Sequence, residues 1–136
     1  MSVHSIPGKL EVSWVDDVRA IVDSWESYTV TLDEFRDAVL VKGLNWARAH
    51  RGQAWIVDSS KAKGAFSQEI QEFIGTDVFP SFAQSGIKYF ITINSEVSTI
   101  TNMTVRNFQS KTGPNGLQLV EVASADDGVE WLRHNA

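Results

Sequence analysis

Residues 53–58 read Gln-Ala-Trp-Ile-Val-Asp and carry the strongest structural signal in the chain, because the stretch is apolar on both alternations. A strand with two apolar faces is typical of the middle of a sheet that is covered on both sides. Residues 88–94, Lys-Tyr-Phe-Ile-Thr-Ile-Asn, predict a second strong strand. Patterns with helical spacing lie around both stretches, so the sequence predicts an α/β domain.

Helix-start signals separate the predicted strands. Thr31-Leu-Asp-Glu34 matches a capping box, and apolar residues then recur at helical spacing, which predicts a helix from about Leu32 to His50. Gly43 lies inside this helix, where glycine is unfavourable, so we expect close packing or a weak point there. Ser67 is placed to cap a second helix. Further helices are predicted over residues 97–108 and after Ser124.

The order of elements is ββαβαβαβα, in one domain over residues 1–136 with its core at about 10–133. Short loops and right-handed crossovers favour a mostly parallel five-stranded sheet with an antiparallel first strand. If consecutive strands lie side by side, every crossover helix lies on the same face of the sheet. The second face then needs a cover, which could be another subunit, a partner or a ligand. Residues expected to point toward that face or to be divided between the faces are Trp55, Val57, Phe90, Val120 and Val122.

Charge and composition exclude several functions. The chain of 136 residues has a net charge of −5 and no cluster of Lys and Arg, which argues against nucleic acid and anionic membrane surfaces as partners. It has no cysteine, so disulfides and thiolate chemistry are excluded. A leader pattern and a long apolar run are also missing, which predicts a cytoplasmic protein without membrane insertion.

Few residues suggest chemistry. His4, His50 and His134 lack the spacing of a metal site, and we expect no metal, no cofactor and no enzymatic activity. Asp58, Ser59 and Ser60 end the central strand, at the edge where open α/β sheets place ligands. The favoured interpretation is that these three side chains bond local loop amides, and the serines lack a histidine base.

Several stretches resemble an uncharacterised bacterial group with the SpoIIAA-like or STAS-like fold. They are Ile21–Trp25, Thr31–Phe35, Trp55–Asp58, Phe66–Ser67, Val78–Pro80, Gly86–Phe90 and Gly128–Leu132. The resemblance implies a STAS-like domain. In the similar anti-sigma-factor antagonists a serine at a helix start is phosphorylated, and Ser67 occupies roughly that place after Asp58-Ser59-Ser60. Glu69 would repel a phosphate, so an N-cap role for Ser67 is favoured over a regulatory one.

Two functions follow as expectations. The first is a non-enzymatic protein-interaction or regulatory module that self-associates, with a homodimer as the expected form. The alternative is binding of a small apolar ligand or lipid, because the fold also resembles lipid-transfer domains with apolar molecules between sheet and helices. Aromatic residues that could line such a space are Trp25, Trp46, Trp55, Phe73 and Phe90. Of these, Trp25, Trp55 and Phe90 are the candidate ligand or interface residues.

Overall fold

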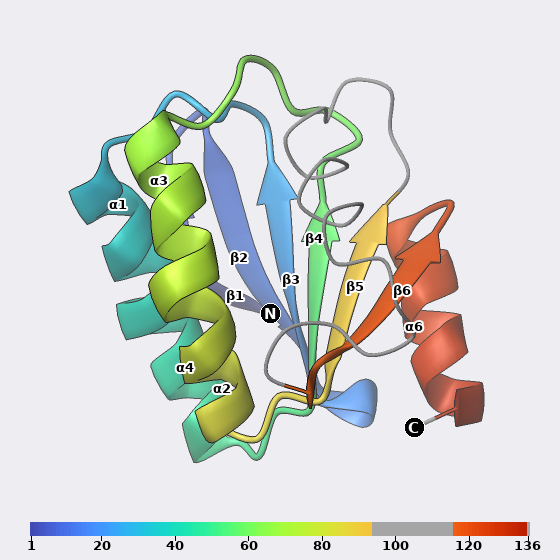
Figure 1. Ribbon diagram of the computed structural model, residues 1–136. Coiled ribbons are helices and arrows are strands. Elements are labelled where there is room, and N and C mark those ends of the chain that lie inside the picture. Colours follow the sequence, from blue (N-terminus) through green and yellow to red (C-terminus); the bar gives the residue numbers. More distant parts are fainter. Residues whose placement is uncertain (94–115, 136) are drawn as a thin grey trace.

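The computed structural model describes residues 1–93 and 116–135, and within them six strands form one mixed sheet (Figure 1). The strands are β1 (Ser2–Ile6), β2 (Leu10–Val15), β3 (Ala20–Trp25), β4 (Ala54–Asp58), β5 (Tyr89–Ile93) and β6 (Gln118–Val122). They lie side by side in chain order; β1, β2 and β3 pair antiparallel, and β3 to β6 pair parallel. The α/β class and the mixed sheet are therefore confirmed, and the strand order, which the sequence left open, is β1-β2-β3-β4-β5-β6.

The expected number of strands is wrong by one. The five predicted strands correspond to β2 to β6, and the sequence interpretation missed β1. This edge strand reads Ser-Val-His-Ser-Ile and none of its residues is fully buried, so it lacks the apolar pattern of the inner strands. β2 and β3 form an antiparallel hairpin and are joined by the short helix η1 (Asp16–Val18), after which Arg19 has a positive φ of 50°.

Two long helical segments cover one face of the sheet (Figure 1). The first runs continuously through α1 (Leu32–Arg36), η2 (Asp37–Leu44) and α2 (Asn45–Ala49). The second runs through α3 (Gln68–Phe73), η3 (Ile74–Val78) and α4 (Phe79–Gln84). In both, the middle portion has π-helical hydrogen bonding.

The helix starts are those that the sequence predicts. Thr31 accepts a hydrogen bond from the Glu34 amide at 3.1 Å, and the Glu34 carboxylate accepts one from the Thr31 amide at 2.9 Å. Gly43 is a site of close packing, because a Cβ there would lie 2.8 Å from Cη2 of Trp55. The first helical segment is thereby held against the central strand.

The second face of the sheet is covered by the chain itself. Helix α6 (Ala125–Asn135) lies on the side opposite the two long segments and contacts β4, β5 and β6 (Figure 1). Buried residues on that side include Ala20, Val22, Ala54, Ile56, Ile91 and Leu132. The expectation of an external cover is therefore wrong for this part of the face, because an amphipathic C-terminal helix supplies the cover.

The helix predicted over residues 97–108 lies outside the described residues. Within residues 1–93 and 116–135, none of the helices has both the length and the apolarity that a membrane crossing requires.

Candidate functional site

A pocket lies between the sheet and the two long helical segments. Its cavity volume is about 50 Å³, and the space between its lining side chains is about 500 Å³ when space open to solvent is included. Of the twelve described residues that line it, eleven are apolar or aromatic, and the other is Asp23. The apolar and aromatic ones are Trp25, Phe35, Val39, Trp55, Val57, Phe66, Ile74, Val78, Phe79, Phe82 and Phe90. We call this space the Asp23 pocket.

Strand register places Asp23 at the sheet side of the pocket. Asp23 lies in β3, beside Val12 of β2 and Val57 of β4. Side chains alternate along a strand, so Asp23 shares its face with Ile21 and Trp25. That face is the one covered by the two long helical segments, and Asp23 is only 2% exposed.

The two carboxylate oxygens of Asp23 are in different situations. Oδ2 accepts a hydrogen bond from Nε1 of Trp55 at 2.8 Å. Oδ1 is buried and has no hydrogen-bond partner among the described residues. Burial raises the pKa of Asp23 to about 7, against a smaller lowering effect of the Trp55 hydrogen bond. A carboxyl group is thus held at the sheet side of an aromatic pocket, and one of its oxygens has no hydrogen-bond partner among the described residues.

Burial of this carboxyl group costs stability, because a charged or unpaired polar group loses its hydration without compensation. Aspartate is also depleted in strands, and the residues that share the inward face of β3 with Asp23, Ile21 and Trp25, are apolar. Groups with strongly perturbed pKa values in a pocket are candidates for functional sites. Asp23 is accordingly the residue on which we base the candidate site.

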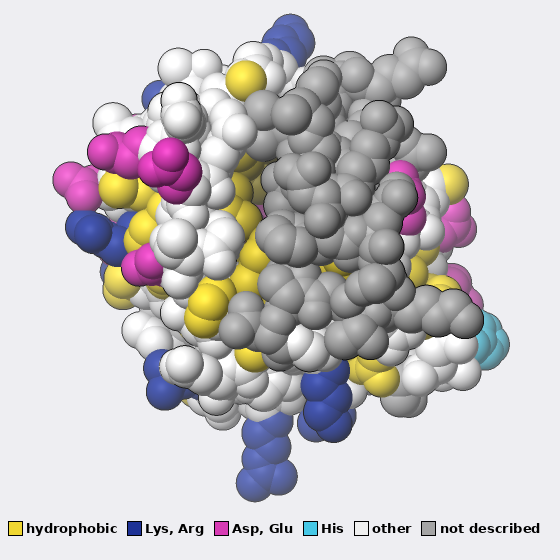
Figure 2. All heavy atoms as spheres, viewed as in Figure 1, with side chains coloured by type: hydrophobic (Ala, Val, Ile, Leu, Met, Phe, Trp, Pro, Cys, Tyr) yellow, Lys and Arg dark blue, Asp and Glu magenta, His cyan; other side chains and the backbone are white. Residues whose placement is uncertain are grey.

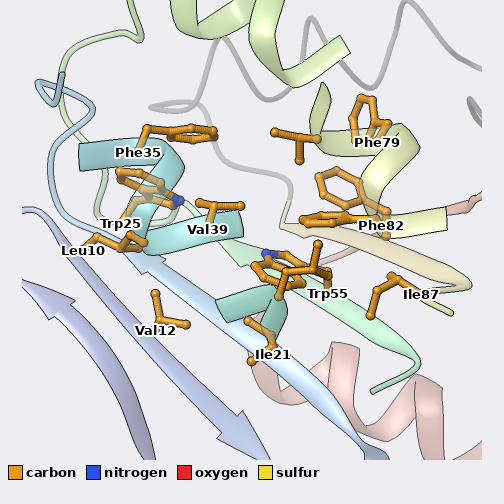
Figure 3. Packing of buried hydrophobic residues seen from close by; sticks show 14 of the residues in the cluster. Leu10, Val12, Ile21, Trp25, Phe35, Val39, Trp55, Phe79, Phe82 and Ile87 are labelled. Atoms are coloured by element: carbon orange, nitrogen blue, oxygen red, sulfur yellow. The ribbon is translucent and has the colours of Figure 1, made fainter. Parts of the chain in front are cut away.

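Aromatic rings form most of the pocket wall. Trp25 stacks on Phe35 with ring centroids 6.0 Å apart, and Trp55 stacks on Phe82 at 4.3 Å. In Figure 3, Trp25 and Phe35 lie at one end of the cluster, Phe82 lies at the other, and Trp55 lies between them. Phe90 packs edge-on against Phe79 at 5.1 Å. The rings leave the carboxyl group of Asp23 in a largely apolar environment.

Both π-helical portions contribute to the pocket. Val39 comes from η2, and Ile74 and Val78 come from η3. Short π-helical segments in proteins are frequently found at functional sites. Figure 2 shows hydrophobic side chains along the helical segment that contains η3. The helical wall of the pocket therefore has irregular backbone bonding in both of its segments.

The aromatic candidates of the sequence interpretation meet at this site. Trp25, Trp55 and Phe90 all line the Asp23 pocket. Trp46 and Phe73 do not: Trp46 stacks on His50 at 4.1 Å, and Phe73 packs edge-on against Phe35. These two side chains project from other parts of the same helices.

The polar candidates lie elsewhere and do not line the pocket. Asp58 accepts hydrogen bonds from the amide and the hydroxyl of Ser60, at 3.1 and 2.7 Å, so the predicted bond to a local loop amide is present for Asp58. Ser59 is fully buried, and its hydroxyl has no partner among the described residues. Ser67 accepts a hydrogen bond from the Ile70 amide at 3.2 Å, as an N-cap does.

Sequence reasoning missed Asp23, although a signal was present. The stretch Ala20–Trp25 reads Ala-Ile-Val-Asp-Ser-Trp, with a carboxylate at an inward-facing position of a strand. We find no group of three or more His, Cys, Asp or Glu residues that could hold a metal ion within residues 1–93 and 116–135.

Comparison with known proteins adds no relative: no family model, curated protein or solved structure matches the chain.

Proposed function

We propose that the protein binds a small, mainly apolar molecule in the Asp23 pocket. The observation that carries the proposal is the free oxygen of Asp23, which is buried at an aromatic wall without a partner among the described residues. Pockets for small molecules are mostly apolar and have a few polar groups that orient the ligand. Asp23 is the orienting group, and the aromatic rings supply the apolar contact area.

The proposal is for binding and not for catalysis. Asp23 is the only titratable residue among the twelve that line the pocket. General acid–base catalysis usually combines groups with different proton affinities, and this described lining offers one such group. A binding role needs only the shape, the apolar wall and the single anchor.

This proposal takes the place of self-association as the leading function. The expectation of a homodimer depended on an uncovered sheet face, and α6 covers the part of that face that β4, β5 and β6 form. A STAS-like plan remains our proposal for the fold. The side-by-side order of the strands and the helical layer over one face support that assignment, and lipid-transfer domains of similar plan offer an analogy for ligand binding.

The experiment is a titration followed by amide chemical shifts, with toluene, phenethyl alcohol and phenethylamine as probes. We expect at least one probe to shift amides of β3, β4 and η3 with saturation. Val39→Phe places a larger side chain at a pocket position that is 2% exposed, and it should abolish the saturable shifts. Val41→Phe is the matched control, because Val41 lies in the same helix and is 44% exposed.

A phenylalanine side chain at position 39 can strain the core, so Val39→Leu is tested as a smaller enlargement. It should also weaken the saturable shifts. Thermal unfolding of each variant shows whether it is folded at the temperature of the titration. If none of the three probes produces saturable shifts in the folded wild-type protein, or if Val41→Phe weakens binding as much as Val39→Phe, the proposal is wrong.

A further inference from the structure

We infer that the ligand of the Asp23 pocket carries a protonated amine, which pairs with the free oxygen of Asp23 while its apolar part contacts the aromatic wall. The inference rests on the proposed function and specifies its ligand class. It starts from the arrangement of a single buried carboxyl group within seven aromatic side chains, those of Trp25, Phe35, Trp55, Phe66, Phe79, Phe82 and Phe90.

None of the described residues that line the pocket offers a cation to Asp23. The lining groups come from β3, β4, β5, the loop before α3 and both long helical segments, and none of them besides Asp23 is titratable. Val12 and Val57 flank Asp23 in the neighbouring strands. The hydrogen bond from Trp55 satisfies one oxygen only, so a donor from outside the described chain can complete the site.

An ammonium group suits both parts of this lining. Opposite charges attract more strongly in a partly desolvated site than in water, and an ammonium group donates hydrogen bonds to a carboxylate. The faces of Trp and Phe rings also attract cations within about 6 Å. A neutral alcohol could donate one hydrogen bond but would gain little from the aromatic faces. A carboxylate ligand would be repelled by ionised Asp23.

One of the two helical segments beside the pocket is negatively charged, which favours a cationic ligand. The segment from α3 to α4, residues 68–84, contains Glu69, Glu72 and Asp77 and has no Lys or Arg. It supplies Ile74, Val78, Phe79 and Phe82 to the pocket. Acidic side chains near a binding site raise the local concentration of cations and repel anions. The whole chain, at −5, has the same sign.

The volume of the pocket limits the size of the ligand. A cavity volume of about 50 Å³ accommodates an amine and a few further atoms, and the remaining apolar part of the ligand lies toward the solvent side of the pocket. The fitting class is therefore a compact primary amine with one ring or a short alkyl group.

The test compares three probes of similar shape, phenethylamine, phenethyl alcohol and phenylacetate, by calorimetric or chemical-shift titration. We expect phenethylamine to bind most tightly at about pH 8.5 and phenylacetate most weakly. The affinity for phenethylamine should rise about 30-fold from pH 5.5 to pH 8.5, because the amine requires ionised Asp23 and burial raises the pKa of that group to about 7. Phenethyl alcohol should show no such rise.

Asp23→Asn keeps the size of the side chain and an acceptor for Trp55, and it should remove both the preference for the amine and its pH dependence. Thermal unfolding shows whether this variant is folded. The pH dependence of the phenethylamine affinity is also measured on the wild-type protein, so that part of the test does not depend on the variant. Equal affinity for the amine and the alcohol at pH 8.5, or an amine affinity that does not change with pH, would overturn the inference while leaving apolar binding in place. Failure of all probes to bind would refute the proposed function as well.

Discussion

Asp23→Asn should change the way in which the stability of this protein depends on pH. In the folded protein the buried carboxyl group has a pKa of about 7, raised from 3.8. Between these two values the unfolded chain releases the proton while the folded chain keeps it. The unfolded state then binds fewer protons, so the free energy of unfolding falls as the pH rises. Below about pH 4 both states hold the proton, and the loss is absent.

The size of the effect follows from the difference between the two pKa values, which is about 3 units. Each unit corresponds to 1.36 kcal/mol, so the full loss is about 4 kcal/mol and is complete slightly above pH 7. A domain of this kind has a total stability of about 5–15 kcal/mol, so the effect is large. The asparagine side chain introduced by the substitution carries no titrating proton, and the variant should not show the loss.

The assay is urea unfolding of the wild type and of Asp23→Asn, followed by tryptophan fluorescence at several values between about pH 4 and pH 8. The quantity compared is the difference between the two free energies of unfolding, because the other carboxyl groups titrate in both proteins. This difference should change by about 4 kcal/mol in favour of the variant as the pH rises. The unpaired amide of the variant adds an offset of about 1–3 kcal/mol that does not depend on pH.

Trp55→Phe serves as a second perturbation of the same group. The hydrogen bond from Trp55 lowers the pKa of Asp23 in the folded protein, so its removal should extend the pH-dependent loss of stability to higher pH and make it larger, while its onset stays unchanged. A difference between wild type and Asp23→Asn that stays constant from pH 4 to pH 8 would refute the reasoning, because it would mean that Asp23 ionises as a hydrated surface carboxylate does.

Two further predictions concern the helices. Gly43→Ala should lower the free energy of unfolding by about 1–3 kcal/mol, since the new Cβ would lie 2.8 Å from the ring of Trp55. The matched variant Gly75→Ala, where nothing lies within 4 Å, should be neutral or stabilise by up to about 1 kcal/mol; equal effects of both in urea unfolding would contradict the packing argument. Ser67→Ala should cost about 1 kcal/mol by the same assay, because it removes the hydrogen bond to the Ile70 amide, and it should leave probe binding unchanged. A loss of binding in the folded Ser67→Ala protein would instead tie Ser67 to the site.

Part of the candidate site could be predicted from the sequence. Trp25, Trp55 and Phe90 stand out as large aromatic residues in or beside strong strands, and all three line the pocket. Asp58, Ser59 and Ser60 also stand out, because they follow a central strand. Their hydrogen bonds turned out to be local where the structure shows them, so position at a sheet edge did not by itself indicate a ligand site.

Asp23 could not be selected in the same way. Whether Asp23 is buried depends on the helices that cover its face of the sheet. A carboxylate at an inward position can still reach solvent when the covering helix is short or displaced. Here Val39, Val78 and Phe82 come from segments 16 or more residues away along the chain and enclose it. The resulting burial at 2% exposure is what raises its pKa.

Local patterns were enough to predict the α/β class, the starts of the helices at Thr31 and Ser67 and the strands at residues 53–58 and 88–94, because capping and alternation act between residues close in sequence. The cover of the second sheet face by α6, the edge strand β1 and the isolated oxygen of Asp23 emerged only from the packed chain. These features depend on which distant side chains exclude water from one another, and that is a property of the three-dimensional packing.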